Sequence, residues 1–331
     1  MSGRHAAPAR PPRTGRGRAG DLPGGRVAAG RAAVGRSVRS GRPGPVGRPP
    51  GPRPAGWLAR RRPDPAIAGS VAVIAVLALF SFAGPIVYHA NLTRVDLLLA
   101  NRPPGPGHPL GTSSYGLDVL GQLMAGGQLS LEVGIAAGIL AGLIGTLWGA
   151  LAGYLGGAAD AAMMRIVDAG IAVPTLVLLL LLTAVYTPGP GTLVLVIAVT
   201  SWLGTARLVR GAALTLRTRE YVQAVGLMGG GRLRAVVRHI VPNAADLITV
   251  NVSFQIADAV VLLATLSYLG LGIQPPAADW GDMVAGGIQN IYNGYWWQIY
   301  PAGLAIIAVV VAFNVLGDAL ADRLDRGGRT R

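Results

Sequence analysis

The chain has 331 residues, of which 51% are hydrophobic and 13% are charged, and its mean hydropathy is +0.48. So few charges cannot cover the surface of a soluble domain, which excludes an ordinary soluble protein and favours an all-α membrane protein with several spans. All 29 basic residues are arginine and there is no cysteine, which excludes a phosphate-binding G-x-x-x-x-G-K-[ST] loop, disulfides and thiolate metal sites.

The net charge of +14 belongs to residues 1–62, which hold 15 arginines and one acidic residue, Asp21. This segment is rich in Gly, Pro and Arg and has few large apolar residues, so we expect a disordered cytoplasmic tail. It is too long and too polar to be a cleavable secretory signal. Its role stays open between a dispensable extension or a start codon placed too early, binding of anionic lipid, and binding of nucleic acid.

Six apolar runs between residues 63 and 326 are long enough to cross a bilayer, which takes about 20 residues per helix. The predicted spans are 66–88, 130–155, 166–186, 192–212, 244–270 and 299–320, followed by a short cytoplasmic tail at 327–331. Pro174 lies near the start of the third span, where neighbouring helices can satisfy the freed carbonyl. In the fourth span Arg207 has to extend toward the lipid headgroups.

Small residues recur along the second span, at a spacing that puts them on neighbouring turns of a helix. These residues are Gly134, Gly138, Gly142, Gly145, Gly149 and Gly153. Because glycine lets another backbone approach closely, we expect this span to be a packing helix inside the bundle.

The arginines predict the orientation, because cytoplasmic loops of membrane proteins carry an excess of basic residues. Residues 60–62 are arginines that precede the first span and place the N-terminus in the cytoplasm; all arginines but Arg94 and Arg102 then lie on that side. The external segments are 89–128 and 271–300. The second contains aromatic residues that favour a belt at the membrane boundary over an aromatic ligand platform: Tyr295, Trp296, Trp297 and Tyr300.

Residues 213–243 are predicted to form a cytoplasmic elbow of two helices. The second helix has an apolar stripe at helical spacing, made of Leu233, Val236, Val237, Ile240 and Val241. The first has a shorter apolar face, made of Tyr221, Val225 and Met228. Gly229, Gly230 and Gly231 are expected to separate the helices, and Pro242 to end the second. The elbow either packs on the membrane domain or rests on lipid headgroups as an amphipathic connector.

Part of the elbow resembles the E-A-A-x3-G loop by which permeases of ABC importers dock onto their ATPase subunit: Gln223-Ala224-Val225, Gly229, His239, Ile240 and Pro242. Further blocks are similar, in the same order, to the second permease of dipeptide and oligopeptide importers: "HPLGTSSYGLDVL" (108–120), "AGYLGGAADAAMMRIVD" (152–168), "LSYLGLGIQPPAADWGDM" (266–283) and "AFNVLGDALADRLD" (312–325). The resemblance covers residues 66–326 and implies the importer-type (type I) ABC permease fold.

This resemblance implies a machine of several chains in the bacterial cytoplasmic membrane. Its expected partners are a second permease, two ATPase subunits that bind the ATP and magnesium, and an external solute-binding protein. No cofactor, metal, nucleic acid or catalytic residue is expected for this chain. The docking residues that the resemblance and the elbow pattern imply are Glu220, Tyr221, Gln223, Ala224, Gly229, Arg232, His239 and Pro242.

Some positions depart from the family pattern. The motif glutamate is Gln223 here, so a charged contact to the ATPase becomes at most a neutral hydrogen bond. Ser113 stands for an aspartate, Gly116-Leu117-Asp118 for G-R-D, and Leu263 for a carboxylate. These changes bear on docking and on substrate preference.

One acidic residue, Asp258, is predicted deep in a span, where a charge costs about 2.5–3.5 kcal/mol. It either faces the translocation pathway or pairs with a neighbouring helix or subunit. Peptides are the expected substrates, with nickel chelates or other small solutes as the alternative. An ion-coupled secondary transporter is the alternative of another class, although such proteins normally hold several ionisable groups at mid-membrane.

Overall fold

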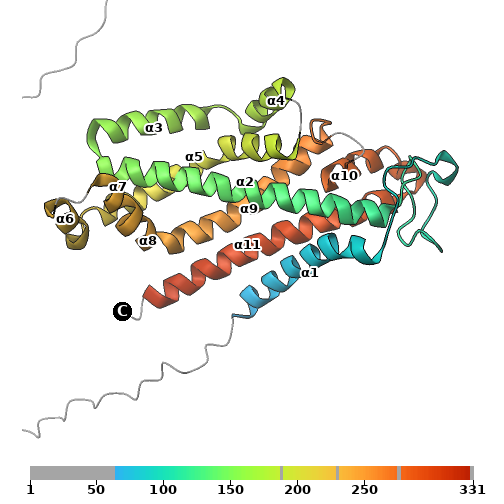
Figure 1. Ribbon diagram of the computed structural model, residues 1–331, viewed down its shortest axis with the longest axis horizontal. Coiled ribbons are helices and arrows are strands. Elements are labelled where there is room, and N and C mark those ends of the chain that lie inside the picture. The colour runs from blue at the N-terminus through green and yellow to red at the C-terminus, as the bar shows by residue number, and fades with distance from the viewer. Residues whose placement is uncertain (1–63, 187–188, 229–230, 274–276, 329–331) are drawn as a thin grey trace, which may run out of the picture. The chain divides into compact units, whose positions relative to one another are not determined.

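The computed structural model describes residues 64–186, 189–228, 231–273 and 277–328. The predicted tail, Gly229 and Gly230 lie outside the described residues. The longer helices are α1 (Pro65–Val87), α2 (Val119–Leu155), α3 (Gly157–Ala172), α4 (Thr175–Val185), α5 (Pro190–Leu216), α9 (Ala245–Tyr268), α10 (Trp280–Ile288) and α11 (Tyr300–Gly328). No strand forms among the described residues, which confirms the all-α class (Figure 1).

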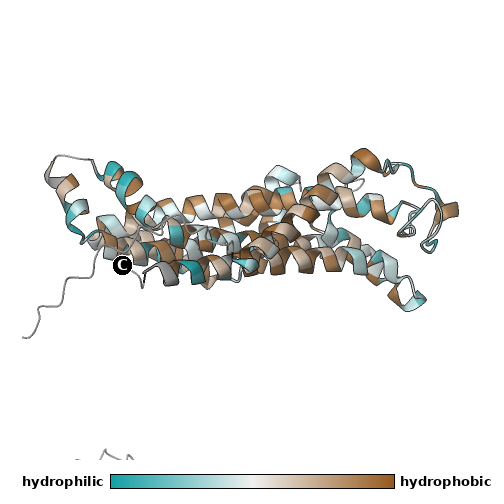
Figure 2. Ribbon diagram, turned by 90° about the horizontal axis from the view of Figure 1, so that it is seen from below, coloured by the Kyte–Doolittle hydropathy of each residue, from teal (hydrophilic) through white to brown (hydrophobic). Residues whose placement is uncertain are grey.

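Among the described residues, five helices are long and apolar enough to cross a membrane, namely α1, α2, α5, α9 and α11, and the bent pair α3 and α4 makes a sixth if it is one span. The apolar residues run along these helices, whereas hydrophilic residues gather at the end that carries the predicted elbow (Figure 2). The chain is therefore a multi-pass membrane protein.

The glycine-rich helix α2 lies at the centre of the bundle and packs against α5, α9 and α1 (Figure 1). A methyl group added at Gly138 would lie 2.7 Å from the Ile256 Cα of α9. One added at Gly149 would overlap the carbonyl oxygen of Ala206 in α5. The prediction of a packing helix is confirmed, because these backbones approach too closely for any side chain.

The second span begins earlier than predicted: α2 starts at Val119, not near residue 130. Its first turns are held by tertiary contacts, since Trp280 of α10 donates from Nε1 to the Leu123 carbonyl at 2.9 Å. Trp280 also lies against Gly127, where an added Cβ would be 2.8 Å from its ring. Glu132 therefore lies well inside the helix and not near its end.

The third span is broken, so the prediction of one helix over 166–186 is wrong. It consists of α3 and α4, which are bent by 86° at Val173 and Pro174. Val173 has φ −88° and ψ 126°, the extended conformation that a following proline favours. The pair also begins earlier than predicted, at Gly157, because Gly156 ends α2 with a φ of +64°.

Both arginines of the fourth span find acidic partners on α3, so Arg207 does not extend alone toward lipid as predicted. Its Nη2 lies 2.7 Å from Asp168 Oδ1. Arg210 binds Asp160 through two parallel bonds, with Nε 2.5 Å from Oδ1 and Nη2 2.7 Å from Oδ2. These pairs tie α5 to α3. The helix itself spans Pro190–Leu216 and is slightly longer at both ends than the predicted 192–212.

The prediction of an aromatic belt at the membrane boundary is wrong for one of its four residues. Trp297 is buried, and its Nε1 donates to the Thr112 carbonyl at 3.1 Å. Trp296 and Tyr300 are about half exposed and remain available at the boundary. The helix that follows, α11, runs to Gly328 rather than ending near the predicted residue 320.

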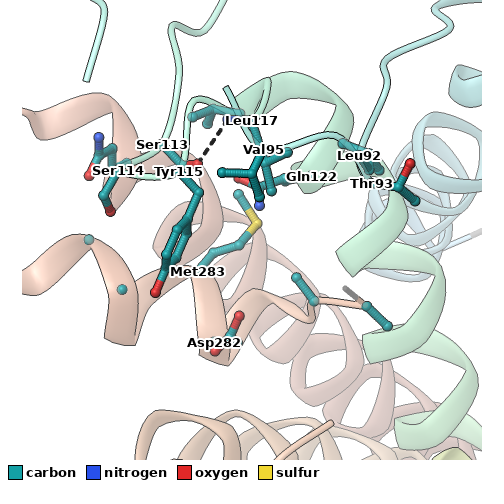
Figure 3. Close-up of a pocket in the computed structure, with 16 residues that line it drawn as sticks. Leu92, Thr93, Val95, Ser113, Ser114, Tyr115, Leu117, Gln122, Asp282 and Met283 are labelled. Atoms are coloured by element: carbon teal, nitrogen blue, oxygen red, sulfur yellow. Dashed lines mark hydrogen bonds between the residues drawn. The ribbon is translucent and has the colours of Figure 1, made fainter. Parts of the chain in front are cut away.

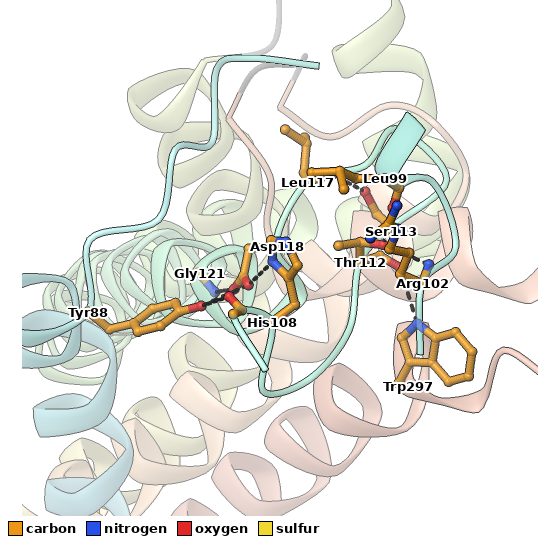
Figure 4. A network of polar contacts seen from close by, with 11 residues as sticks. Tyr88, Leu99, Arg102, His108, Thr112, Ser113, Leu117, Asp118, Gly121 and Trp297 are labelled. Carbon is orange, nitrogen blue, oxygen red and sulfur yellow. Dashed lines mark hydrogen bonds and ion pairs between the residues drawn. The ribbon is translucent and has the colours of Figure 1, made fainter. Parts of the chain in front are cut away.

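The segment between α1 and α2 is tied together by Asp118, which caps α2 (Figure 4). Its Oδ1 accepts from the Gly121 N–H at 2.8 Å, and its Oδ2 lies 2.8 Å from both His108 Nδ1 and the Tyr88 hydroxyl. Burial, together with the hydrogen bond to Asp118, raises the pKa of Tyr88 to about 12. The hydroxyl therefore remains a donor, and one carboxylate joins α1, the loop and α2.

Asp118→Ala is expected to lower the thermal midpoint of unfolding of the purified protein. It removes the helix cap and also the contacts of the buried carboxylate with His108 and Tyr88. A lost cap alone costs about 1 kcal/mol, and side-chain hydrogen bonds to a charged group add about 1.5–3 kcal/mol each. Asp96→Ala is the matched control, since Asp96 caps only the short helix Leu97–Leu99 through the Leu98 N–H. Equal midpoints for the two variants would show that the network stabilises nothing.

Candidate functional site

The predicted elbow lies at one end of the bundle and consists of four short helical pieces (Figure 1). They are α6 (Glu220–Leu227), α7 (Arg232–Ala235), a π-helical turn (Val236–Ile240) and α8 (Val241–Asn243). The elbow shares a hydrophobic core with the membrane helices. That core joins elbow residues to residues of α2 and α5: Val222, Val236, Ile240, Ala150, Val209 and Ala213. The interpretation as a piece that packs on the bundle is therefore correct.

The faces that the elbow buries differ from the predicted ones. In the second helix Val236 and Ile240 are buried as expected, but Leu233 and Val237 are 67% and 48% exposed. In the first helix Val222 and Val225 are buried, whereas Tyr221 and Met228 are exposed. A helix that crosses other helices touches them over a narrow strip, so part of each apolar face is left uncovered.

The second helix ends within one residue of Pro242, as predicted. The helical run continues through α8 to Asn243, and α9 begins at Ala245. The π-helical turn precedes the proline, with the Val241 N–H bonded to the Val236 carbonyl. A wider turn is a common adjustment near a residue that lacks an N–H, and it lets the elbow pass directly into α9.

One hollow of about 620 Å³ lies between the two arms of the elbow, on its outward side. It is lined by Tyr221, Ala224, Val225, Met228, Arg234, Arg238 and His239. Of the predicted docking residues, Tyr221, Ala224 and His239 come together here. The sequence prediction of docking residues omitted Met228. The two arginines in the hollow, Arg234 and Arg238, are among those that lie off the apolar stripe. The hollow combines apolar walls with positive charge.

A second hollow, of about 460 Å³, lies between the elbow and the end of α2. Gln223 and Arg232 line it together with Arg217, so the predicted docking residues fall into two separate groups. Gln223 points back to its own chain, where Nε2 donates to the Thr218 carbonyl at 3.4 Å. Glu220 and Pro242 are exposed outside both hollows.

Asp258 lies on an exposed strip of α9 together with Val261 and Tyr268. Within the described ranges its carboxylate has no hydrogen bond or ion pair. Pairing with another helix of this chain is therefore not observed among those residues.

Residues 145–330 match the protein family described as binding-protein-dependent transport system inner membrane component. The matched part includes the elbow, α9 and α11. The chain belongs to this family. Dipeptide transport system permease protein DppC of Bacillus subtilis (strain 168) is 36% identical over 269 residues, or 81% of this chain and 84% of that protein. Oligopeptide transport system permease protein OppC of the same organism is 37% identical over 260 residues, or 78% and 85%.

A third relative, the probable D,D-dipeptide transport system permease protein DdpC of Escherichia coli (strain K12), is 35% identical over 269 residues, or 81% of this chain and 89% of that protein. The predicted family is thereby confirmed. The chain is an inner membrane component of a binding-protein-dependent transport system, with the type I permease fold. The elbow lies within the part of the chain that matches the family.

Proposed function

We propose that this chain is one of two permeases of an ATP-driven importer for dipeptides or oligopeptides in the bacterial cytoplasmic membrane. Its relatives are named for dipeptide and oligopeptide transport. The observation that carries the proposal is the elbow, which joins an outward hollow to a core shared with α2 and α5. Another chain that binds in the hollow could therefore move the elbow, and the shared core would pass that movement to α2 and α5.

In this proposal the two termini and the elbow lie in the cytoplasm, where basic residues accumulate. Two ATPase subunits bind ATP and magnesium and dock on the elbow, while a solute-binding protein delivers the peptide from outside. The second permease is a different chain, so the pair is a heterodimer. Closure of the ATPases displaces the elbow, and its buried side chains pass the movement to the spans. This chain carries no chemical step.

The docking contact is proposed to use the hollow between the two arms. Tyr221 and Met228 offer exposed apolar surface, which favours a hydrophobic contact, and Arg234 and Arg238 select an acidic partner surface. Gln223 is turned toward Thr218 and the other hollow, so it contributes less than the motif glutamate.

Asp258 is proposed to face the translocation pathway. A carboxylate exposed on a span is costly in lipid, about 2.5–3.5 kcal/mol on insertion scales, so water or a polar partner must surround it in the assembled protein. A peptide with a charged amino terminus would meet a favourable charge there. The proposed role is attraction of the substrate within the pathway.

The docking proposal is tested by co-purification of the ATPase subunits with the permease. Arg238→Glu is expected to weaken ATPase binding by about tenfold or more, because a reversed charge meets the acidic surface that the arginine selects. Arg219→Glu is the control, since Arg219 is exposed on the same segment but lines neither hollow.

Equal binding by the two variants would overturn the assignment of this hollow as the docking contact. Transport by the reconstituted chain along an ion gradient, with no ATPase present, would overturn the importer proposal itself.

A further inference from the structure

A cavity of about 410 Å³ lies at the end of the bundle opposite the elbow, between the α1–α2 segment and α10 (Figure 3). Its size is within the range of small-molecule sites. Most of its lining is apolar or neutral, with Leu92, Val95 and Met283 on its walls. Its lining contains no basic side chain. One charged group, the carboxylate of Asp282, is on its wall.

Asp282 has no counter-ion among the residues that the structure describes. The side chain is half-buried on the first turn of α10, and within the described residues it makes no hydrogen bond or ion pair. Burial and the nearby carboxylate of Asp279 raise the pKa of Asp282. A carboxylate removed from water without a partner is unfavourable, so this position favours a cation that enters the cavity.

The neighbouring Asp279 differs from Asp282, because its carboxylate is hydrogen-bonded within the chain. It accepts hydrogen bonds from the Ser267 hydroxyl at 2.5 Å and from the Gly281 and Asp282 N–H groups at 2.7 and 3.1 Å. Asp279 therefore has a structural explanation, as the cap of α10. Asp282 lies on the first turn of the same helix, where a negative charge is favourable, but its side chain makes no hydrogen bond or ion pair within the described residues.

A smaller hollow of about 260 Å³ lies beside the cavity. The two share Leu92, Gln122, Ala277 and Ala278 on their walls. The smaller one is also lined by Glu132 of α2, which is exposed.

We propose that this cavity receives the protonated amino terminus of a peptide, with Asp282 as its counter-ion and the apolar wall beside the first side chains. This inference rests on the proposed function, since it assumes peptide substrates. The amino terminus of a peptide has a pKa near 8, so it is charged at neutral pH. The cavity acts as a receiving site for the peptide before it enters the pathway.

The test uses the full transporter with its ATPases in lipid nanodiscs, without the solute-binding protein. Binding of Ala-Ala and of N-acetyl-Ala-Ala is measured by saturation-transfer NMR. Ala-Ala is expected to bind and the acetylated peptide to bind at least about tenfold more weakly, since it lacks a charge-assisted hydrogen bond. Asp282→Asn, which keeps the shape of the side chain, is expected to weaken Ala-Ala binding by a similar factor. Asp96→Asn is the matched control, because Asp96 lies in the α1–α2 segment, lines neither hollow and can still cap the Leu98 N–H as asparagine, so the affinity should stay within about twofold.

Equal binding of the two peptides to the wild type, or unchanged Ala-Ala binding to Asp282→Asn, would overturn the proposal. Equal losses for Asp282→Asn and Asp96→Asn would show general attraction by negative charge and overturn it too. Weaker docking of the solute-binding protein on Asp282→Asn, with no peptide binding, would assign the cavity to a basic side chain of that partner. Failure of the wild type with its binding protein to import any peptide would instead refute the proposed function.

Discussion

Gly149→Ala is expected to destabilise the protein more than any other single methyl group added to α2. The new Cβ would overlap the Ala206 carbonyl oxygen and lie 3.0 Å from the Arg210 nitrogen, both of them backbone atoms of α5. Overpacking costs about 1–3 kcal/mol where side chains can adjust, and a rigid helix backbone adjusts less. Alanine in place of glycine favours a helix by about 0.5–1 kcal/mol, which is too little to compensate.

The measurement is the midpoint of unfolding in mixed micelles, with Gly211→Ala as the control. Gly211 lies in α5 like the contacted residues, but nothing lies within 4 Å of a Cβ built there. Its replacement should leave the midpoint unchanged or raise it slightly. Similar midpoints for the two variants would mean that α2 and α5 do not approach as closely in the membrane as the structure shows.

Ile240→Ala is expected to reduce transport much more than ATP hydrolysis in the assembled importer. Ile240 is fully buried in the core that joins the elbow to α2 and α5. Truncation of a buried isoleucine costs about 2–5 kcal/mol. If about 2 kcal/mol of that is lost from the contact between the elbow and the bundle, the equilibrium constant for seating the elbow on the bundle falls by about thirtyfold. Docking residues on the outward side are unchanged, so the ATPases still bind.

Leu233→Ala is the control for this experiment. Leu233 lies on the same helical run but is 67% exposed and lines neither hollow of the elbow. We expect near-normal transport per ATP hydrolysed in this variant. The measurement is uptake of labelled peptide and phosphate release in the same proteoliposomes. A normal ratio of uptake to phosphate release in Ile240→Ala would refute the idea that the elbow core transmits the movement.

Much of the architecture was predictable because lipid imposes a simple condition. A span needs a long apolar run, and such runs are visible without any knowledge of packing. The glycines of α2 carried further information, since close packing of helices in lipid uses small residues. The family was predictable as well, because its motifs lie in order along the chain.

The boundaries and breaks of the helices were less predictable. The first turns of α2 contain Gly126, Gly127 and Gln128 and read as loop, but Trp280 from a distant helix holds them. Pro174 was visible in the sequence, yet the choice between a tolerated proline and an 86° break depends on the helices around it. Arg207 was read as a group that reaches toward lipid because its acidic partner lies 39 residues away.

The sequence by itself determined the class of protein, the spans and the position of the elbow, because hydrophobicity and local spacing act on neighbouring residues. Only the tertiary structure decided which half of each apolar face in the elbow is buried, which residues form the outward hollow, and that Asp282 lies in a cavity without a counter-ion. Burial and charge at a position depend on segments that are distant in the chain, and no local pattern reports them.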